Sequence, residues 1–176
     1  IARMLNCEFN EFAEHPMVNF YPENRAEEID ALNDEIGDRV TDGVYRCLLA
    51  ASQEAYDNNF KELFSTLDQL NERLSHSRYL LGDSPTEPDW RLFGSLIRFD
   101  AVYYSLYKCN ERRIVDYDRL WDYTRDLFQI PKVAETVDLE KIKIGYYRSF
   151  KKDSIIPKGP YMDLNAPHNR HRLETE

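Results

Sequence analysis

Apolar side chains recur every three or four residues along most of this 176-residue chain, which is the period of an α-helix. The clearest stripe lies in residues 57–75, where charged and polar side chains occupy the opposite face. Six apolar positions form it: Phe60, Leu63, Phe64, Leu67, Leu70 and Leu74. This pattern predicts an amphipathic helix that packs one face against a core.

A second apolar stripe predicts a long helix that begins after Pro22 and continues to about Ala55. Gly37 and Gly43 fall inside it, and each costs roughly 1 kcal/mol relative to alanine in a helix interior. Similar stripes predict shorter helices near residues 116–128 and 136–148. Because no convincing alternating strand pattern occurs, we expect an all-α fold, a bundle of roughly five to seven helices.

Thr86 and Asp89 have the spacing of a capping box just before an apolar run that starts at Trp90. The Thr86 hydroxyl can accept a hydrogen bond from the N–H three residues on, and the Asp89 carboxylate can accept from the Thr86 N–H. The run that follows, to about Leu106, is apolar on more than one side. We therefore expect a central, buried helix here.

The chain starts inside an apolar helical pattern, from Ile1 to Phe12, with no cap and no initiator methionine. We therefore expect it to be the C-terminal part of a longer protein. Residues 1–14 are predicted to end a preceding domain, residues 15–160 to form the helical domain, and residues 161–176 to form an extended C-terminal tail rich in turn residues.

The composition, with 42% hydrophobic and 31% charged residues, is that of a globular protein. The net charge of −9 argues against nucleic-acid partners, and no apolar run is long enough for a membrane partner to be expected. The charge is uneven, because residues 141–158 carry six basic side chains and one acidic one. That basic segment either docks on the acidic first half of the chain or forms the rim of an anion-facing pocket.

Three cysteines, Cys7, Cys47 and Cys109, are odd in number and far apart, so we expect no disulfide framework and a reducing, cytoplasmic location. Cys47 and Cys109 are either inert buried thiols or reactive ones; neither belongs to a CxxC pair. His168 and His171 have a spacing that could bind a metal on a helix, but no third ligand accompanies them. We therefore expect solvated histidines and no metal.

Twelve tyrosines are many for this length, and the context of three makes them candidates for a binding site: Tyr45, Tyr103 and Tyr146. A neutral phenol can donate a hydrogen bond to a developing phenolate or to a quinone oxygen. The alternative is structural, with the ring buried and the hydroxyl satisfied locally. The residues alone leave both readings open.

Short segments along nearly the whole chain resemble, in order, the C-terminal half of the xi-class glutathione transferases, the glutathionyl-hydroquinone reductases. Examples are DGVYR at 42–46, RYLLGD at 78–83, TEPDWRLF at 86–93, LIRFDAVY at 96–103, YKCN at 107–110, YYRS at 146–149 and IPKGP at 156–160. The resemblance implies a transferase-like C-terminal helical bundle, preceded by the last helix of a missing thioredoxin-like domain.

The family resemblance implies a glutathione-dependent enzyme that removes glutathione from glutathionyl-hydroquinones, with glutathione as co-substrate. In that family the nucleophile is the cysteine of a Cys-Pro motif in the thioredoxin-like domain, and no Cys-Pro occurs here. We therefore expect no catalytic residue in this chain and no activity from it alone.

Tyr45 and Tyr146 match the family tyrosines that line the aromatic-substrate pocket, and Tyr103 matches a position nearby. The resemblance also implies a homodimer through the helical domain. The alternative function is a non-catalytic, transferase-like helical module that serves assembly.

Overall fold

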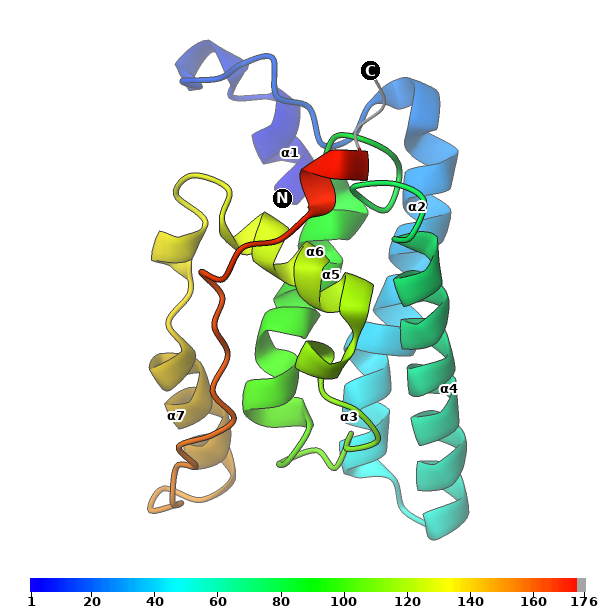
Figure 1. Cartoon of the computed structure of the whole chain (residues 1–176), viewed down its shortest axis with the longest axis vertical. Helices are drawn as coiled ribbons and strands as arrows, with labels where there is room; N and C mark the ends of the chain where they lie inside the picture. Colours follow the sequence, from blue (N-terminus) through cyan, green and yellow to red (C-terminus); the bar gives the residue numbers. More distant parts are fainter. Residues whose placement is uncertain (174–176) are drawn as a thin grey trace.

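The computed structural model describes residues 1–173 and is built from helices (Figure 1). The α-helices are α1 (Ala2–Cys7), α2 (Ala26–Glu35), α3 (Asp42–Leu49), α4 (Gln53–Arg73), α5 (Glu87–Arg98), α6 (Asp118–Phe128) and α7 (Leu139–Phe150). Within the described residues the only β-pairing is an isolated bridge between Tyr79 and Gly82, so the all-α prediction is confirmed. No helix in that range is long and apolar enough to cross a membrane.

Helices α2 and α3 form one rod, joined by the π-helical segment η3 (Ile36–Thr41). The predicted end of this rod near Ala55 is wrong, because α3 stops at Leu49. The reason is local: the Ser52 hydroxyl caps the next helix by accepting a hydrogen bond from the Ala55 N–H at 3.1 Å. Helix α4 consequently starts at Gln53, a turn earlier than its apolar stripe indicated.

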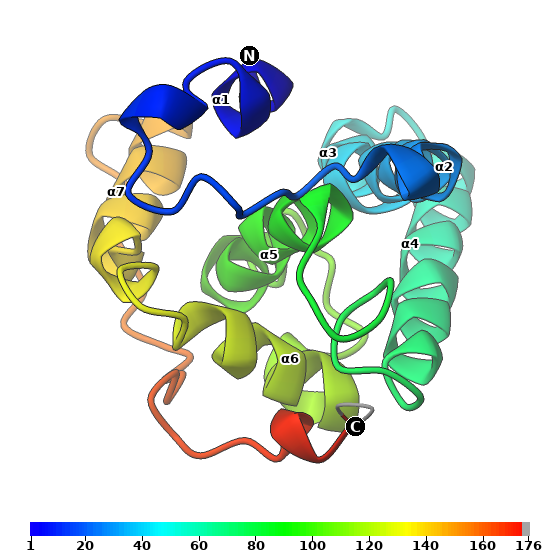
Figure 2. The same cartoon turned by 90° about the horizontal axis from the view of Figure 1, so that it is seen from above.

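The predicted central helix is α5, which lies in the middle of the molecule (Figure 2). Helices α2–α4 lie on one side of it, α7 lies on the opposite side, and α6 lies below it in this view. Its capping box is formed, and the Asp89 carboxylate accepts from the Thr86 N–H at 2.7 Å. After Arg98 the chain widens into the π-helical segment η4 (Phe99–Tyr103), where the Tyr104 N–H donates to the Phe99 carbonyl. Regular helix therefore ends before Leu106.

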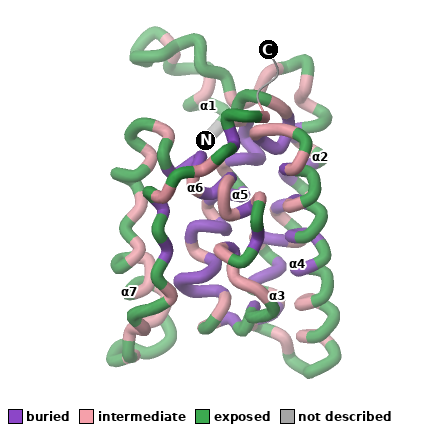
Figure 3. The backbone as a smooth tube through the Cα atoms, viewed as in Figure 1, coloured by how far each residue is buried: buried purple, intermediate pink, exposed green. Residues whose placement is uncertain are grey.

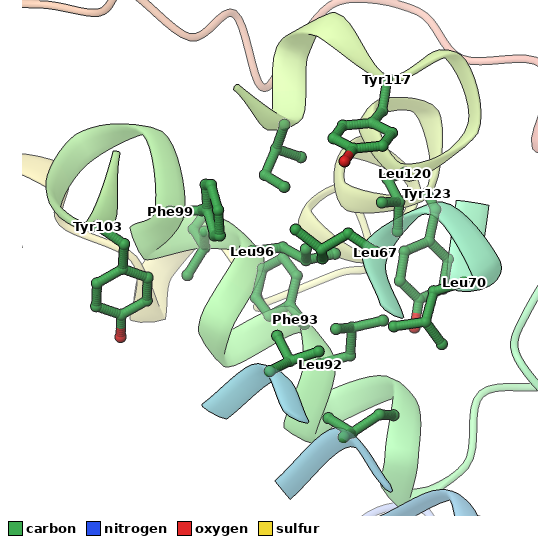
Figure 4. Close-up of a cluster of buried hydrophobic side chains, with 14 of the residues drawn as sticks. Leu67, Leu70, Leu92, Phe93, Leu96, Phe99, Tyr103, Tyr117, Leu120 and Tyr123 are labelled. Atoms are coloured by element: carbon green, nitrogen blue, oxygen red, sulfur yellow. The ribbon is translucent and has the colours of Figure 1, made fainter. Parts of the chain in front are cut away.

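The core surrounds α5 and η4, and the buried backbone is concentrated there (Figure 3). Apolar side chains from α4, α5 and α6 meet in one cluster, shown in Figure 4 with Leu67, Leu96 and Leu120 among them. Tyr103 lies at the edge of this cluster with its hydroxyl pointing away from it (Figure 4). The core thus holds the η4 backbone in place while leaving one phenol directed outward.

The predicted helical pattern from Ile1 to Phe12 is only partly correct, because α1 ends at Cys7 and a 3₁₀ turn follows at Asn10–Phe12. Several apolar side chains of this segment are exposed, so little packing is present to propagate the helix. Arg3 fastens α1 to the domain through ion pairs with Asp30 and Glu87.

The C-terminal segment returns past α7 and α6 (Figure 1), and the prediction of an extended tail is only partly correct, because Arg170–Leu173 form a 3₁₀ helix. Gln129 donates to the carbonyls of Leu164 and Ala166, both at 2.9 Å. Arg170 is buried and donates to the Leu74 carbonyl at 2.7 Å. Residues 174–176 of the predicted tail lie outside the described residues.

Candidate functional site

The three tyrosines singled out by sequence converge at their hydroxyl groups. Tyr146 Oη lies 3.4 Å from Tyr45 Oη and 3.2 Å from Tyr103 Oη, so it shares a hydrogen bond with each. Tyr45 belongs to α3, Tyr103 ends η4 and Tyr146 lies on α7. Three distant parts of the sequence therefore supply one cluster of phenols.

The two π-helical segments help to position this cluster. η3 immediately precedes the helix that carries Tyr45, and Tyr103 is the last residue of η4. Short π segments inside helices are common at functional sites, because the extra residue per turn shifts the direction of the side chains that follow. α7 packs against η4, and the rings of Tyr103 and Tyr146 meet edge to face at 5.8 Å between centroids.

A fourth tyrosine, Tyr107, belongs to the cluster and was missed by the sequence analysis. Its ring centroid lies 5.2 Å from that of Tyr45 and 5.1 Å from that of Tyr103. The sequence did hold a signal: Tyr107 follows Tyr103 by four residues, a spacing that places both side chains on one side of a helical backbone.

An open groove of about 700 Å³ runs beside the cluster, between α3 and α7. Tyr45, Tyr107 and Tyr146 line it, whereas Tyr103 is 4% exposed and lies behind Tyr146. Apolar side chains complete the walls, and Arg98 and Lys141 add positive charge. We call this feature the tyrosine groove; it combines apolar surface, convergent hydroxyls and basic groups, as small-molecule sites do.

Burial favours the protonated form of Tyr45, Tyr103 and Tyr107. It raises the pKa of Tyr45, and more strongly the pKa of Tyr103 and Tyr107, while the charge of Arg98 opposes the rise at Tyr103. The trio Tyr45, Tyr103 and Tyr146 is joined by two hydrogen bonds. Tyr45 and Tyr146 line the groove, so their hydroxyls can turn from each other to donate to a ligand there.

Two lysines of the basic segment 141–158 have their contacts within the second half of the chain. Lys141 pairs with Asp138 at 3.1 Å, and Lys143 donates to the carbonyls of Pro157 and Lys158. Lys141 also lines the tyrosine groove. Neither lysine thus contacts the acidic half through these bonds, and Lys141 supports the pocket-rim interpretation.

The histidine prediction is partly wrong. His171 is exposed, as expected. The His168 side chain is only 12% exposed, and its imidazole lies 3.5 Å from the Asp126 carboxylate. Burial lowers the pKa of His168, and the Asp126 charge opposes this. Within residues 1–173, no three His, Cys, Asp or Glu side chains are grouped as metal ligands would be. Cys47 and Cys109 are buried, as one of the two readings required.

Comparison with known proteins places this geometry in context. Residues 53–126 match the family model described as "Glutathione S-transferase, C-terminal domain". Glutathionyl-hydroquinone reductase YqjG of Escherichia coli (strain K12) is 42% identical over 173 residues, which are 97% of this chain and 52% of YqjG.

Two solved structures superpose closely on the chain. The glutathione-bound structure of YqjG, described as a glutathione transferase homolog from Escherichia coli K-12, has a TM-score of 0.91 at 41% identity and covers 96% of this chain and 56% of its own. A xi-class transferase from Natrialba magadii has a TM-score of 0.92 at 41% identity, covering 97% and 53%.

The helical bundle thus has the fold of a glutathione transferase C-terminal domain, and residues 53–126 match the model of that domain. The chain is similar to xi-class transferases and to glutathionyl-hydroquinone reductases, as the sequence motifs indicated. The chain spans about half the length of the relatives it matches.

Proposed function

We propose that this chain is the aromatic-substrate-binding half of a glutathione-dependent reductase that acts on glutathionyl-hydroquinones. The observation that carries the proposal is the convergence of the Tyr45, Tyr103 and Tyr146 hydroxyls beside one groove. A module that served only assembly needs no phenols directed at a cleft. The name of the relative YqjG, a glutathionyl-hydroquinone reductase, supports the same substrate class.

The proposed reaction begins at a cysteine outside this chain, in a thioredoxin-like domain. Its thiolate attacks the sulfur of the glutathionyl-hydroquinone, the aromatic C–S bond breaks, and the ring carbon takes up a proton. The products are the free hydroquinone and a cysteine–glutathione mixed disulfide. A second glutathione thiolate then releases glutathione disulfide and regenerates the cysteine.

The tyrosine groove contributes binding and electrostatics to this reaction. Electron density moves onto the aromatic oxygens as the C–S bond breaks, and neutral phenol donors stabilise that charge. Tyr45 and Tyr146, which line the groove, are the proposed direct donors, while Tyr103 orients Tyr146 from behind. Arg98 and Lys141 at the groove lower the cost of negative charge there.

The exposed apolar side chains near the start of the chain support the proposal of a neighbouring domain. Leu5 is 65% exposed and Phe12 is 79% exposed, and Met4 and Phe9 are exposed as well. In a solvated monomer such a group of large apolar side chains is an unusual arrangement. The division into residues 1–14, 15–160 and 161–176 remains part of this proposal, as do the homodimer and the cytoplasmic location.

The test is Tyr146→Phe in the full-length protein that carries this chain, assayed with a glutathionyl-hydroquinone and glutathione. Loss of one transition-state donor predicts a fall in kcat/KM of about 100-fold. Tyr161→Phe is the matched control, because that ring is 87% exposed and does not line the groove. An unchanged kcat/KM in correctly folded Tyr146→Phe protein would contradict the proposed role.

A further inference from the structure

Gly145 is a glycine in the middle of a helix whose presence no contact within the described chain explains. It lies in α7, one position before Tyr146, and its backbone is helical, a conformation open to almost any residue. A Cβ built on it would meet no atom of the described residues within 4 Å, apart from its adjoining residues and its own helix backbone. Since glycine weakens a helix relative to alanine, neither backbone geometry nor crowding favours it here.

The missing side chain at this position would point into the tyrosine groove. Gly145 is exposed and lines that groove. The residues one turn away on α7 line it as well: Lys141, Ile142 and Ser149. Because residues three and four apart share one face of a helix, position 145 lies in the middle of the face that α7 presents to the groove. With no side chain at this position, the helix backbone itself forms this part of the wall.

The surface around Gly145 suits an apolar group of a ligand. Leu48 and Leu49 line the groove from α3, and Ile142 and Phe150 line it from α7. Leu49 is 74% exposed and Phe150 is 54% exposed, so these side chains have apolar area left to bury. Removing such area from water by contact with an apolar group is favourable.

The polar side chains on the same face of α7 have partners of their own. The Ser149 hydroxyl donates to the Tyr146 carbonyl at 2.7 Å, and Lys141 pairs with Asp138 at 3.1 Å. The hydroxyls of Tyr45 and Tyr146 are therefore the polar groups of the groove best placed to hold the oxygens of an aromatic ring.

The groove is larger than a single aromatic ring requires. It measures about 700 Å³, whereas an apolar cavity of about 150 Å³ in another protein is sufficient to bind benzene. Part of the additional space lies against the backbone of Gly145, and any larger side chain at this position would fill it.

We propose that Gly145 determines the specificity of the tyrosine groove, because the space left by its missing side chain admits a bulky alkyl substituent on the ring of a hydroquinone. The tyrosine hydroxyls hold the ring oxygens, and the substituent lies against the α7 backbone and the leucines of α3. Residue 145 contacts the substituent and takes no part in the chemical steps. This inference rests on the proposed function, since that function places the aromatic part of the substrate in the groove.

The test compares two substrates of the full-length protein that carries this chain: the glutathionyl derivatives of hydroquinone and of tert-butylhydroquinone. In Gly145→Leu the leucine would fill the space, so kcat/KM is expected to fall at least about tenfold more for the tert-butyl substrate than for the unsubstituted one. Gly145→Ala is expected to shift the ratio of the two values in the same direction by about threefold.

The alanine variant also separates this role from a structural one. Because alanine favours a helix, Gly145→Ala is expected to have a higher Tm than the wild type while it discriminates more strongly against the tert-butyl substrate. A lower Tm would show that packing requires the glycine and would overturn the proposal.

Arg148→Leu is the matched control for the leucine variant. It places a leucine on α7 at an exposed position that does not line the groove, and arginine and leucine have similar helix propensities. We expect the wild-type ratio of the two kcat/KM values in this control. Circular dichroism checks that each variant is folded, and if Gly145→Leu unfolds, the ratio measured for Gly145→Ala decides the proposal.

The outcomes distinguish this inference from the function on which it rests. Equal falls for both substrates in folded Gly145→Leu, or an unchanged ratio, would overturn the role of Gly145 and leave the proposed function intact. If the wild type turned over neither substrate, the proposed function would itself be contradicted, and the specificity role with it.

Discussion

Asp100 is a carboxylic acid with no exposed surface in η4, the segment that ends at Tyr103. Its two oxygens accept the backbone N–H groups of Ile114 at 2.6 Å and Val115 at 3.2 Å. Burial raises its pKa to about 6, although these two hydrogen bonds act in the opposite direction. The carboxyl group of Asp100 therefore changes charge at mildly acidic pH, because its pKa lies well above that of an ordinary aspartate.

This raised pKa predicts a pH dependence of stability. The folded state binds the Asp100 proton more tightly than the unfolded state, so protonation favours folding. Relative to the non-titrating variant Asp100→Asn, the wild type is expected to lose up to about 3 kcal/mol of unfolding free energy as pH rises from about 4 to about 6, and to change little above that. Urea unfolding of both proteins across this range measures the difference. A difference that is flat, or that grows with pH, would contradict the assigned pKa.

At the scale of single residues, the sequence identified side-chain chemistry better than side-chain contacts. Tyr45 and Tyr146 were selected because family motifs pointed to them, and their hydroxyls do meet. Tyr107 was missed although it follows Tyr103 by four residues, because that spacing alone does not show that both rings meet Tyr45.

Among the elements, the start of α5 is the junction on which most others depend. The Asp89 carboxylate accepts from the N–H of Leu80 at 2.9 Å, from the hydroxyl of Tyr123 at 2.8 Å, and from both the N–H and the hydroxyl of Thr86. One fully buried side chain thus joins α5 to the preceding loop and to α6. The sequence predicted only the contact with Thr86.

Replacing this junction carboxylate is expected to destabilise the whole domain. In Asp89→Asn, an amide NH₂ would face donors where an acceptor oxygen is needed, and the expected cost is about 3 kcal/mol of unfolding free energy. Asp138→Asn is the matched control, since Asp138 caps the exposed start of α7 by accepting from the Lys141 N–H. That control is expected to cost under about 1 kcal/mol. Equal losses in chemical unfolding would refute the junction role.

Two glycines are predicted to respond in opposite ways to substitution by alanine. A Cβ at Gly37 in η3 would meet no atom within 4 Å, so Gly37→Ala should stabilise the domain by about 0.5–1 kcal/mol. Gly82 has a φ of 123°, which L side chains seldom adopt, so Gly82→Ala should destabilise it by about 2 kcal/mol. Thermal unfolding of the two variants measures the change in stability caused by each substitution. A stabilised Gly82→Ala protein would contradict the turn geometry.

The sequence pattern predicted which helices form, but it did not predict their boundaries or the two π-helical segments. The stripe in α4 and the capping box of α5 are strong local signals, and both elements are present. The break after Leu49 depends on the competition between continuing α3 and capping α4 with Ser52, two local preferences of similar size. The π segments η3 and η4 bring tyrosines together through tertiary packing, which hydrophobic periodicity cannot reveal.

For the molecule as a whole, the tyrosine groove is the proposed binding surface, and no cysteine lines it. Cys47 and Cys109 are buried and do not line it, and Cys7 lies on α1. The groove residues come from α3, from the end of α5 and beyond, and from α7, all within this chain. Binding of the aromatic group and cleavage of its bond to sulfur are therefore expected to be separable properties.

The isolated 176-residue chain is predicted to bind a hydroquinone without turning over its glutathionyl derivative. Binding needs only the apolar walls and hydroxyl donors of the groove, whereas the proposed reaction needs the thiolate of the separate domain. Titration calorimetry of the chain with a hydroquinone should show saturable heat that Tyr45→Phe plus Tyr146→Phe weakens about tenfold or more, while Tyr161→Phe leaves it unchanged. A parallel assay should find no glutathione-dependent release of hydroquinone. Turnover by the chain alone would show that the nucleophile lies in this chain, and would contradict the proposal of a separate catalytic domain. Absence of any binding would contradict the proposed role of the tyrosine groove.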